Sequence, residues 1–299
     1  MTLTKHINKI MEVIFVIALS LICLFISQKS PIFIGVIPIT FALFYFNEGT
    51  LSYLLGAFGT YFVGLIFASR EDLFTSLIPL LLIGLSLIIL VSLKFSARVE
   101  IITTFIITSL IFIFIYKYTM LVDGLDINSL ALNLKENFEE IYSYDLDLDI
   151  LRLTASLYPA IIGWVSMLYS VISIKIIRNY LANKSEAYTD IKNLDELRMS
   201  PKDLLIILAV SLVIFYLGKF FGIKDLYLVG NLLLIIMMFF AINGASLLDF
   251  MLKKSSLPLT RAFQWFFMLI LIQVLLIPLI ILGIADVFID FRARRKNEK

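Results

Sequence analysis

Residues 73–93 read LFTSLIPLLLIGLSLIILVSL, an unbroken run that contains no charged side chain. A transmembrane helix needs about 20 predominantly apolar residues to cross the hydrocarbon core of a bilayer. Lipid offers no hydrogen-bond partners, so a crossing backbone must satisfy its own groups, which a helix does. This stretch therefore predicts a membrane-spanning helix.

The composition of the whole chain agrees with that reading. Of 299 residues, 61% are hydrophobic and 16% are charged, whereas soluble domains carry roughly 45–50% apolar and about 25% charged residues. A soluble globular, disordered or coiled-coil protein is excluded on these figures. The net charge of +2 creates no field that would attract nucleic acid, so we expect no nucleic-acid partner and a lipid bilayer as the surroundings.

Apolar runs of similar character recur along the chain. They predict an all-α, polytopic bundle of about eight to nine transmembrane helices, in a single integral membrane domain over residues 1–299. The run at 32–46 is short and contains Pro38, so we expect it to be tilted, kinked or re-entrant. The predicted spans are Met11–Ser27, Ile32–Phe46, Leu51–Ala68, Leu73–Leu93, Ile101–Val122, Leu153–Ile177, Leu204–Phe221, Leu226–Leu248 and Ala262–Val287.

Lysine and arginine in short flanks predict the orientation, because cytoplasmic loops carry an excess of both. Lys5 and Lys9 place the N-terminus inside, the acidic connection 123–152 outside and the connection 179–202 inside. A single last crossing would then export the cationic tail. Either the final apolar run doubles back or one span is wrong, so the side of the C-terminus stays open.

The two long connections have distinct patterns. Apolar residues at three- and four-residue spacing over 127–142 predict an amphipathic helix at the membrane surface. The following YDLDLDI (144–150) lacks the glycine and glutamate that a calcium loop needs, which favours a solvated acidic edge. In the inner connection, SPKD at 200–203 has the residue types that begin a helix, so we expect the next span to start there.

A stripe of small residues follows one face of the third predicted span. Such faces let two helices approach closely in a membrane. Packing inside the same bundle is the favoured interpretation, and docking of a second membrane protein is the alternative. The stripe consists of Ser52, Gly56, Thr60, Gly64 and Ala68.

Amide side chains lie deep in the last two predicted spans. Asn231, Asn243 and Gln273 are candidates to line a polar cavity, with Asn231 and Gln273 as the preferred pair. Interhelical hydrogen bonds are common in membrane proteins, so a structural role is the favoured interpretation for each.

Charges gather at the end of the last predicted span. Asp286 and Asp290 are four residues apart and share a helix face, and Asp290 can pair with Arg294 at the same spacing. Together with Arg292 they form a terminal charge cluster. We expect it to clamp the terminus against an inner loop, with contact to lipid headgroups as the alternative.

The sequence provides little support for catalysis or for a cofactor. The single histidine, His6, lies near the N-terminus, and the single cysteine, Cys23, allows no intrachain disulfide. The chain contains no HExxH, CxxC or Walker-type motif. We therefore expect no enzyme, no cofactor and no metal site.

Residues 197–205 (LRMSPKDLL), the stretch 231–258 and the closing GIAD…DFR pattern (283–292) together resemble the YybS-like family of predicted bacterial membrane proteins. The resemblance extends over nearly the whole chain and is strongest from about residue 195. It implies a multi-pass protein of the bacterial plasma membrane, in a family with no settled biochemical function.

The layout of the first half is similar to that of the substrate-binding components of energy-coupling-factor vitamin transporters. It is also similar to the layout of small cell-shape membrane proteins of the MreD type. Two hypotheses follow: a small-solute binding or transport-related component with an unknown ligand, and a non-transporting scaffold that recruits cell-envelope proteins. An enclosed polar pocket would favour the first, and a solidly packed interior would favour the second.

Overall fold

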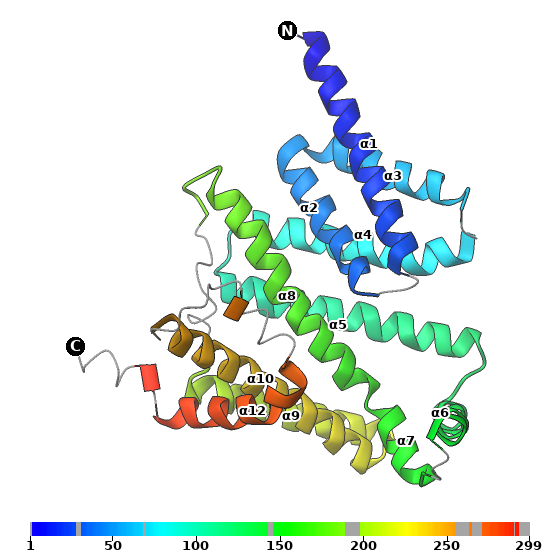
Figure 1. Ribbon diagram of the computed structural model, residues 1–299, viewed down its shortest axis with the longest axis vertical. Coiled ribbons are helices and arrows are strands. Elements are labelled where there is room, and N and C mark those ends of the chain that lie inside the picture. Colours follow the sequence, from blue (N-terminus) through cyan, green and yellow to red (C-terminus); the bar gives the residue numbers. More distant parts are fainter. Residues whose placement is uncertain are drawn as a thin grey trace. The chain divides into compact units, whose positions relative to one another are not determined.

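The computed structural model describes residues 2–27, 31–67, 70–142, 146–188, 198–254, 263–264, 271–289 and 291–292. Within those ranges all regular secondary structure is helical (Figure 1). Six helical segments are long and apolar enough to cross a membrane, and two shorter apolar helices accompany them at Phe33–Glu48 and Val274–Ile289. The predicted helical membrane bundle is therefore confirmed.

The chain divides into two compact units. Unit 1 comprises Met1–Asp126 and Val165–Ile191, and unit 2 comprises Ile127–Trp164 and Lys192–Lys299. Helix α8 (Tyr158–Ala182) contributes to both units. The single membrane domain expected from the sequence stays a prediction.

Unit 1 is built around helix α4, which contains most of the uncharged run at residues 73–93. It contains α1 (Thr2–Ser27), the 3₁₀ helix η1 (Pro31–Gly35), α2 (Val36–Glu48), α3 (Thr50–Gly64), α4 (Arg70–Ser92), α5 (Ala97–Val122) and the C-terminal part of α8. Helix α4 packs against α2 and α5, and α1 packs against α3. The core of this unit includes Phe41, Leu77, Ile83 and Leu87, which are fully buried.

The second and third predicted spans are shorter in the structure than a full crossing. Gly49 has a φ of 82°, a left-handed conformation that glycine adopts without strain, and it separates α2 from α3. Helix α3 has 15 residues, or about 22 Å, which is less than the roughly 30 Å of the hydrocarbon core. The third predicted span continued to Ala68 because the residues after Gly64 are apolar, but the helix ends at Gly64.

Unit 2 contains α6 (Ile127–Tyr142), α7 (Leu148–Ser156), the first turns of α8, α9 (Pro201–Phe220), α10 (Asp225–Lys254) and α12 (Ile272–Ile289). The amphipathic helix predicted over 127–142 is confirmed as α6. The acidic run that follows is partly a helix start, because the Asp147 side chain accepts a hydrogen bond of 2.8 Å from the Asp149 amide. The predicted span 153–177 is interrupted after Ser156, where α7 ends and α8 begins.

The start of α9 agrees with the sequence. The Ser200 side chain accepts a hydrogen bond from the Asp203 amide, and the Asp203 carboxylate accepts one from the Ser200 amide, which forms a capping box. Each bond satisfies a backbone group at a helix end that has no partner within the helix. The predicted helix start is confirmed.

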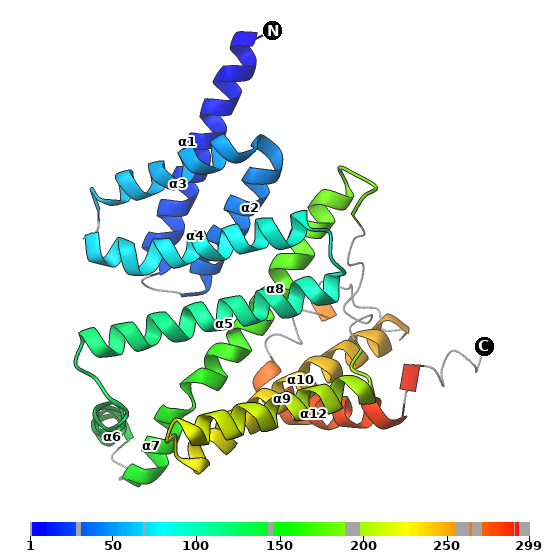
Figure 2. The ribbon, with the colours of Figure 1, turned by 180° about the vertical axis from the view of Figure 1, so that it is seen from behind.

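The last predicted span, 262–287, lies partly outside the described residues. Within them, α12 covers Ile272–Ile289. Helices α10 and α12 pack together and run in the same direction (Figures 1 and 2). Their C-terminal ends therefore lie at the same end of unit 2, so Lys253 and Arg292 share one side. The cationic tail lies outside the described residues, so the side of the C-terminus stays open.

Candidate ligand-binding groove

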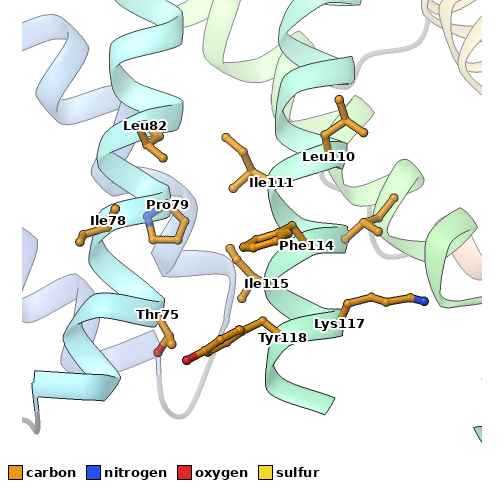
Figure 3. Close-up of a pocket in the computed structure, with 11 residues that line it drawn as sticks. Thr75, Ile78, Pro79, Leu82, Leu110, Ile111, Phe114, Ile115, Lys117 and Tyr118 are labelled. Carbon is orange, nitrogen blue, oxygen red and sulfur yellow. The ribbon is translucent and has the colours of Figure 1, made fainter. Parts of the chain in front are cut away.

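Helices α4 and α5 form the two walls of an open pocket. It has a volume of about 890 Å³ and lies wholly within unit 1. Its walls are almost entirely apolar, and in Figure 3 Pro79 of α4 faces Ile111, Phe114 and Ile115 of α5 across the gap. We call this pocket the α4–α5 groove.

Proline inside α4 shapes one wall of the groove. Pro79 has no amide hydrogen, so the i→i−4 bond to the Thr75 carbonyl cannot form at this turn. The pyrrolidine ring contributes a flat apolar surface at the same position. Helix α4 continues through Pro79 without a break.

The groove opens outward instead of into the core of the unit. Three of its apolar side chains are strongly exposed: Phe114 at 72%, Leu110 at 62% and Leu82 at 50%. In a membrane, an apolar surface of this kind between two spanning helices faces lipid tails. A molecule could therefore reach the groove from the bilayer without crossing the interior of the protein.

One end of the groove is polar. Thr75 lies near the start of α4, and Lys117 and Tyr118 lie near the end of α5. In Figure 3 the Tyr118 ring extends across the gap toward Thr75, whereas the Lys117 side chain extends away from α4. This site was not predicted from the sequence, although Pro79 within one apolar run and Lys117 near the end of another were visible signals of it.

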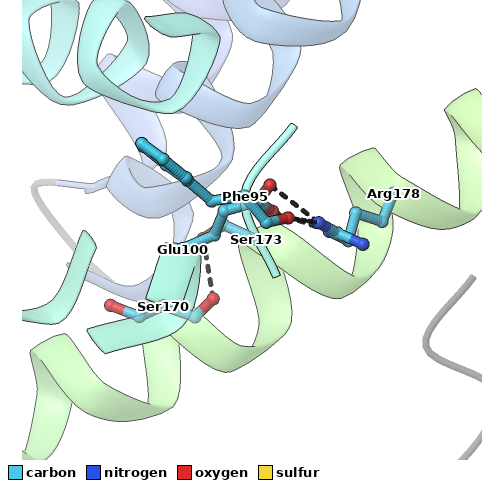
Figure 4. Close-up of polar contacts among 5 residues, drawn as sticks. All are labelled: Phe95, Glu100, Ser170, Ser173 and Arg178. Carbon is cyan, nitrogen blue, oxygen red and sulfur yellow. Dashed lines mark hydrogen bonds and ion pairs between the residues drawn. The ribbon is translucent and has the colours of Figure 1, made fainter. Parts of the chain in front are cut away.

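A buried ion pair holds α8 to the start of α5 within unit 1. Arg178 Nε donates to Glu100 Oε2 at 2.6 Å, and Arg178 Nη2 donates to Glu100 Oε1 at 2.8 Å. Nη2 also donates to the carbonyl oxygen of Phe95 (Figure 4). Glu100 is 0% exposed and Arg178 is 4% exposed. The bidentate geometry matches the planar guanidinium to the carboxylate, which makes the contact specific as well as strong.

The sequence did not predict this ion pair, because each charged residue lies one position outside a predicted span. The predicted spans began at Ile101 and ended at Ile177, so both charges appeared to be flanking residues. Their opposite signs at the ends of two long apolar runs were the only signal. Buried hydroxyl groups continue from Glu100 along α5 at Thr104 and Thr108, both fully buried.

The small-residue stripe on α3 is used for packing inside unit 1. A Cβ atom at Gly56 would lie 3.3 Å from the Phe41 ring, and one at Gly64 would lie 3.0 Å from a methyl group of Leu73. Ser52 and Thr60 are fully buried. Both hydroxyls donate to carbonyl oxygens of the preceding turn. As placed, these four residues are covered by helices of the same unit, and Ala68 lies outside the described residues.

The two asparagines form interhelical hydrogen bonds. Asn231 donates to the carbonyl oxygens of Ser156 and Tyr227 at 2.9 and 2.8 Å, and its own oxygen accepts from the Ala160 amide at 3.0 Å. It thereby satisfies backbone groups on both sides of the break between α7 and α8. Such a bonding pattern fits a structural role, which was the favoured interpretation.

Asn243 is 2% exposed and joins three segments of unit 2. Its oxygen accepts from the Met199 amide at 3.0 Å, and its nitrogen donates to the Gly283 carbonyl at 2.9 Å. Neither asparagine lines the α4–α5 groove. The side chain of Gln273 lies outside the described residues, so its pairing with Asn231 stays a prediction.

The terminal charge cluster is described in part. The Asp286 carboxylate is fully buried and lies 3.2 Å from Arg292 Nη2, which also donates to the Asn243 carbonyl at 3.5 Å. These contacts join Arg292 to Asp286 of α12 and to α10, and the clamp against an inner loop stays a prediction. Asp290 and Arg294 lie outside the described residues.

Long apolar helices define a polytopic helical membrane protein. Residues 13–287 match the model of a family described as a predicted membrane protein family, DUF2232, and the chain belongs to that family. No curated protein and no solved structure matches the chain.

Proposed function

We propose that the protein is a non-enzymatic, transport-related membrane component that binds a small, largely apolar molecule in the α4–α5 groove. The observation that carries this proposal is the groove itself, an 890 Å³ pocket with apolar walls between two spanning helices. Small-molecule sites in proteins typically have volumes of about 300–1,000 Å³ and mostly apolar linings.

The polar contacts of the bundle support an apolar ligand over a polar one. Asn231 and Asn243 use their amide groups on neighbouring backbone atoms. The ligand, which the sequence leaves unknown, is in this proposal a molecule that dissolves in the membrane, because the groove is apolar. The similarity in layout to transporter substrate-binding components is compatible with a binding role. The YybS-like resemblance is compatible with a location in the bacterial plasma membrane.

Groove-filling variants test the proposal. Leu82→Trp places a large ring in the groove, and Leu85→Trp on the same helix is the matched control, since Leu85 has a similar exposure (43% against 50%) but does not line the groove. Each protein is purified in mild detergent, and the bound small molecules are identified by mass spectrometry. We expect the wild type and L85W to retain a bound apolar molecule and L82W to lose it. Equal retention by all three proteins would contradict the proposal.

A scaffold function is the second candidate, and helix α9 favours it. Gly218 is the one buried residue of this 20-residue helix, and apolar side chains such as Leu205, Tyr216 and Phe220 are 67–83% exposed. Lipid or another membrane protein must cover this surface. Co-purification of stoichiometric membrane proteins with an empty groove would support the scaffold and count against the binding function.

A further inference from the structure

We propose that the occupant of the α4–α5 groove is an anionic glycerophospholipid, with one acyl chain along the groove and its phosphate beside Lys117. This inference rests on the proposed binding function and names the class of ligand. Three properties of the groove carry it: the depth of its polar end, its length and its charge.

The polar end of the groove lies close to the boundary of the hydrocarbon core, where a long side chain reaches the lipid headgroups. Helix α5 has 26 residues, or about 39 Å, so it exceeds the roughly 30 Å hydrocarbon core at its ends. Lys117 precedes the last residue, Val122, by about 8 Å along the axis. Tyr118 beside it has the amphipathic ring that collects at membrane interfaces. Thr75 is equally close to the first residue of α4, so both helices present polar groups at the same end.

The length of the groove matches one acyl chain. From Leu110 to Tyr118 along α5 it extends over eight residues, or about 12 Å. One leaflet of the hydrocarbon core is about 15 Å deep, half of the roughly 30 Å total. The groove therefore covers most of the depth of a single leaflet, with its apolar end directed toward the bilayer centre.

The charge at the polar end favours an anionic headgroup. The Lys117 side chain is exposed, and within the described part of the chain no hydrogen bond or ion pair engages its ammonium group. Its neighbours in the groove wall, Ile113 and Phe114, are apolar. A long lysine side chain at such a position extends its ammonium group to the interface, where lipid phosphates lie. A lysine near an anionic lipid surface contributes about a fivefold preference in affinity for anionic over zwitterionic lipids. In a zwitterionic headgroup, the positive group offsets the attraction between the lysine and the phosphate.

Native mass spectrometry with defined lipids tests the inference. Purified protein in detergent is titrated with phosphatidylglycerol and with phosphatidylcholine of identical acyl chains, and the apparent Kd of the first bound lipid is measured. We expect the wild type to bind phosphatidylglycerol about fivefold more tightly. Lys117→Gln should abolish this preference while retaining binding. Lys175→Gln, which removes a lysine from α8 outside the groove, should keep it.

The outcomes separate the two proposals. If L82W loses both lipids while the wild type binds them equally, the groove binds lipid but the anionic preference is wrong. If K117Q keeps the full preference, the assignment of the phosphate to Lys117 is wrong. If L82W binds both lipids as the wild type does, the proposed binding function itself fails.

Discussion

Substitution of the glycines at the α10–α12 crossing tests how the end of the chain is held. A Cβ atom at Gly244 would collide with the Leu279 carbonyl oxygen and lie 2.7 Å from its carbon. A Cβ atom at Gly283 would meet the Phe240 carbonyl in the same way. Ordinary contact begins at 3.4 Å, and backbone atoms cannot rotate away as a side chain can. The carbonyl carbon alone requires a separation of roughly 0.7 Å in either Gly→Ala variant, and the nearer carbonyl oxygen requires more.

The cost can be worked from the contacts that this separation changes. Forcing an extra methyl group into a packed interior costs about 1–3 kcal/mol. The 2.9 Å bond from Asn243 to the Gly283 carbonyl would stretch beyond hydrogen-bonding distance, which adds about 1 kcal/mol. Alanine regains about 1 kcal/mol over glycine in helix propensity. We expect a net loss of about 1–3 kcal/mol for G244A and for G283A.

Unfolding in detergent with increasing dodecyl sulfate, followed by circular dichroism, measures this loss. Gly230→Ala is the matched control on α10, because its Cβ would meet only the ends of the Leu157 and Leu153 side chains, at 3.0 and 3.9 Å. G230A should be neutral or slightly stabilising, since a flexible side chain can move aside. If G244A and G283A are as stable as G230A, the close crossing described here is wrong.

Three further substitutions test single contacts. Glu100→Gln leaves Arg178 charged and buried, so it should destabilise unit 1 by about 3–5 kcal/mol in the same unfolding assay. Replacing both residues by glutamine should recover much of this loss. An E100Q protein that unfolds at the same dodecyl sulfate concentration as the wild type would rule out this contribution. Asn231→Ala leaves backbone groups at the α7–α8 break without partners, so amide hydrogen exchange over residues 156–160 should accelerate and the free energy of unfolding should fall by about 1–3 kcal/mol. Unchanged exchange over these residues would show that another group satisfies the backbone groups. Ser200→Ala removes a helix cap, so the Asp203 amide should exchange its hydrogen faster and the free energy of unfolding should fall by about 1 kcal/mol. An Asp203 amide that exchanges as slowly as in the wild type would contradict the capping box.

The sequence was sufficient for features that depend on local chemistry. The uncharged run at 73–93 became α4, the three- and four-residue spacing at 127–142 became α6, and SPKD began α9. In each case the signal is contained in a few adjacent residues. Hydrophobicity was a poorer guide to where helices end, because glycine and proline end or interrupt a helix without lowering the hydropathy of a run.

The candidate site depended on tertiary packing and could not be read in the same way. Glu100 and Arg178 are 78 residues apart, and no local pattern indicates that they meet. The groove arises because Pro79 and Phe114 belong to adjacent helices, and many apolar runs contain such residues without forming a pocket. Asn231 and Asn243 were singled out as polar groups within apolar runs, but their partners are backbone atoms that no side-chain pattern reveals.

Spin-label accessibility in proteoliposomes tests most directly whether the α4–α5 groove faces lipid. Single cysteines at Leu110 and Phe114, in a Cys23→Ala background, carry nitroxides at two exposed positions of the groove. We expect strong relaxation by oxygen, which concentrates in the bilayer core, and little effect of a water-soluble nickel chelate. Nickel accessibility exceeding that of oxygen at Phe114 would place the groove in water and contradict both the membrane placement and the proposed ligand.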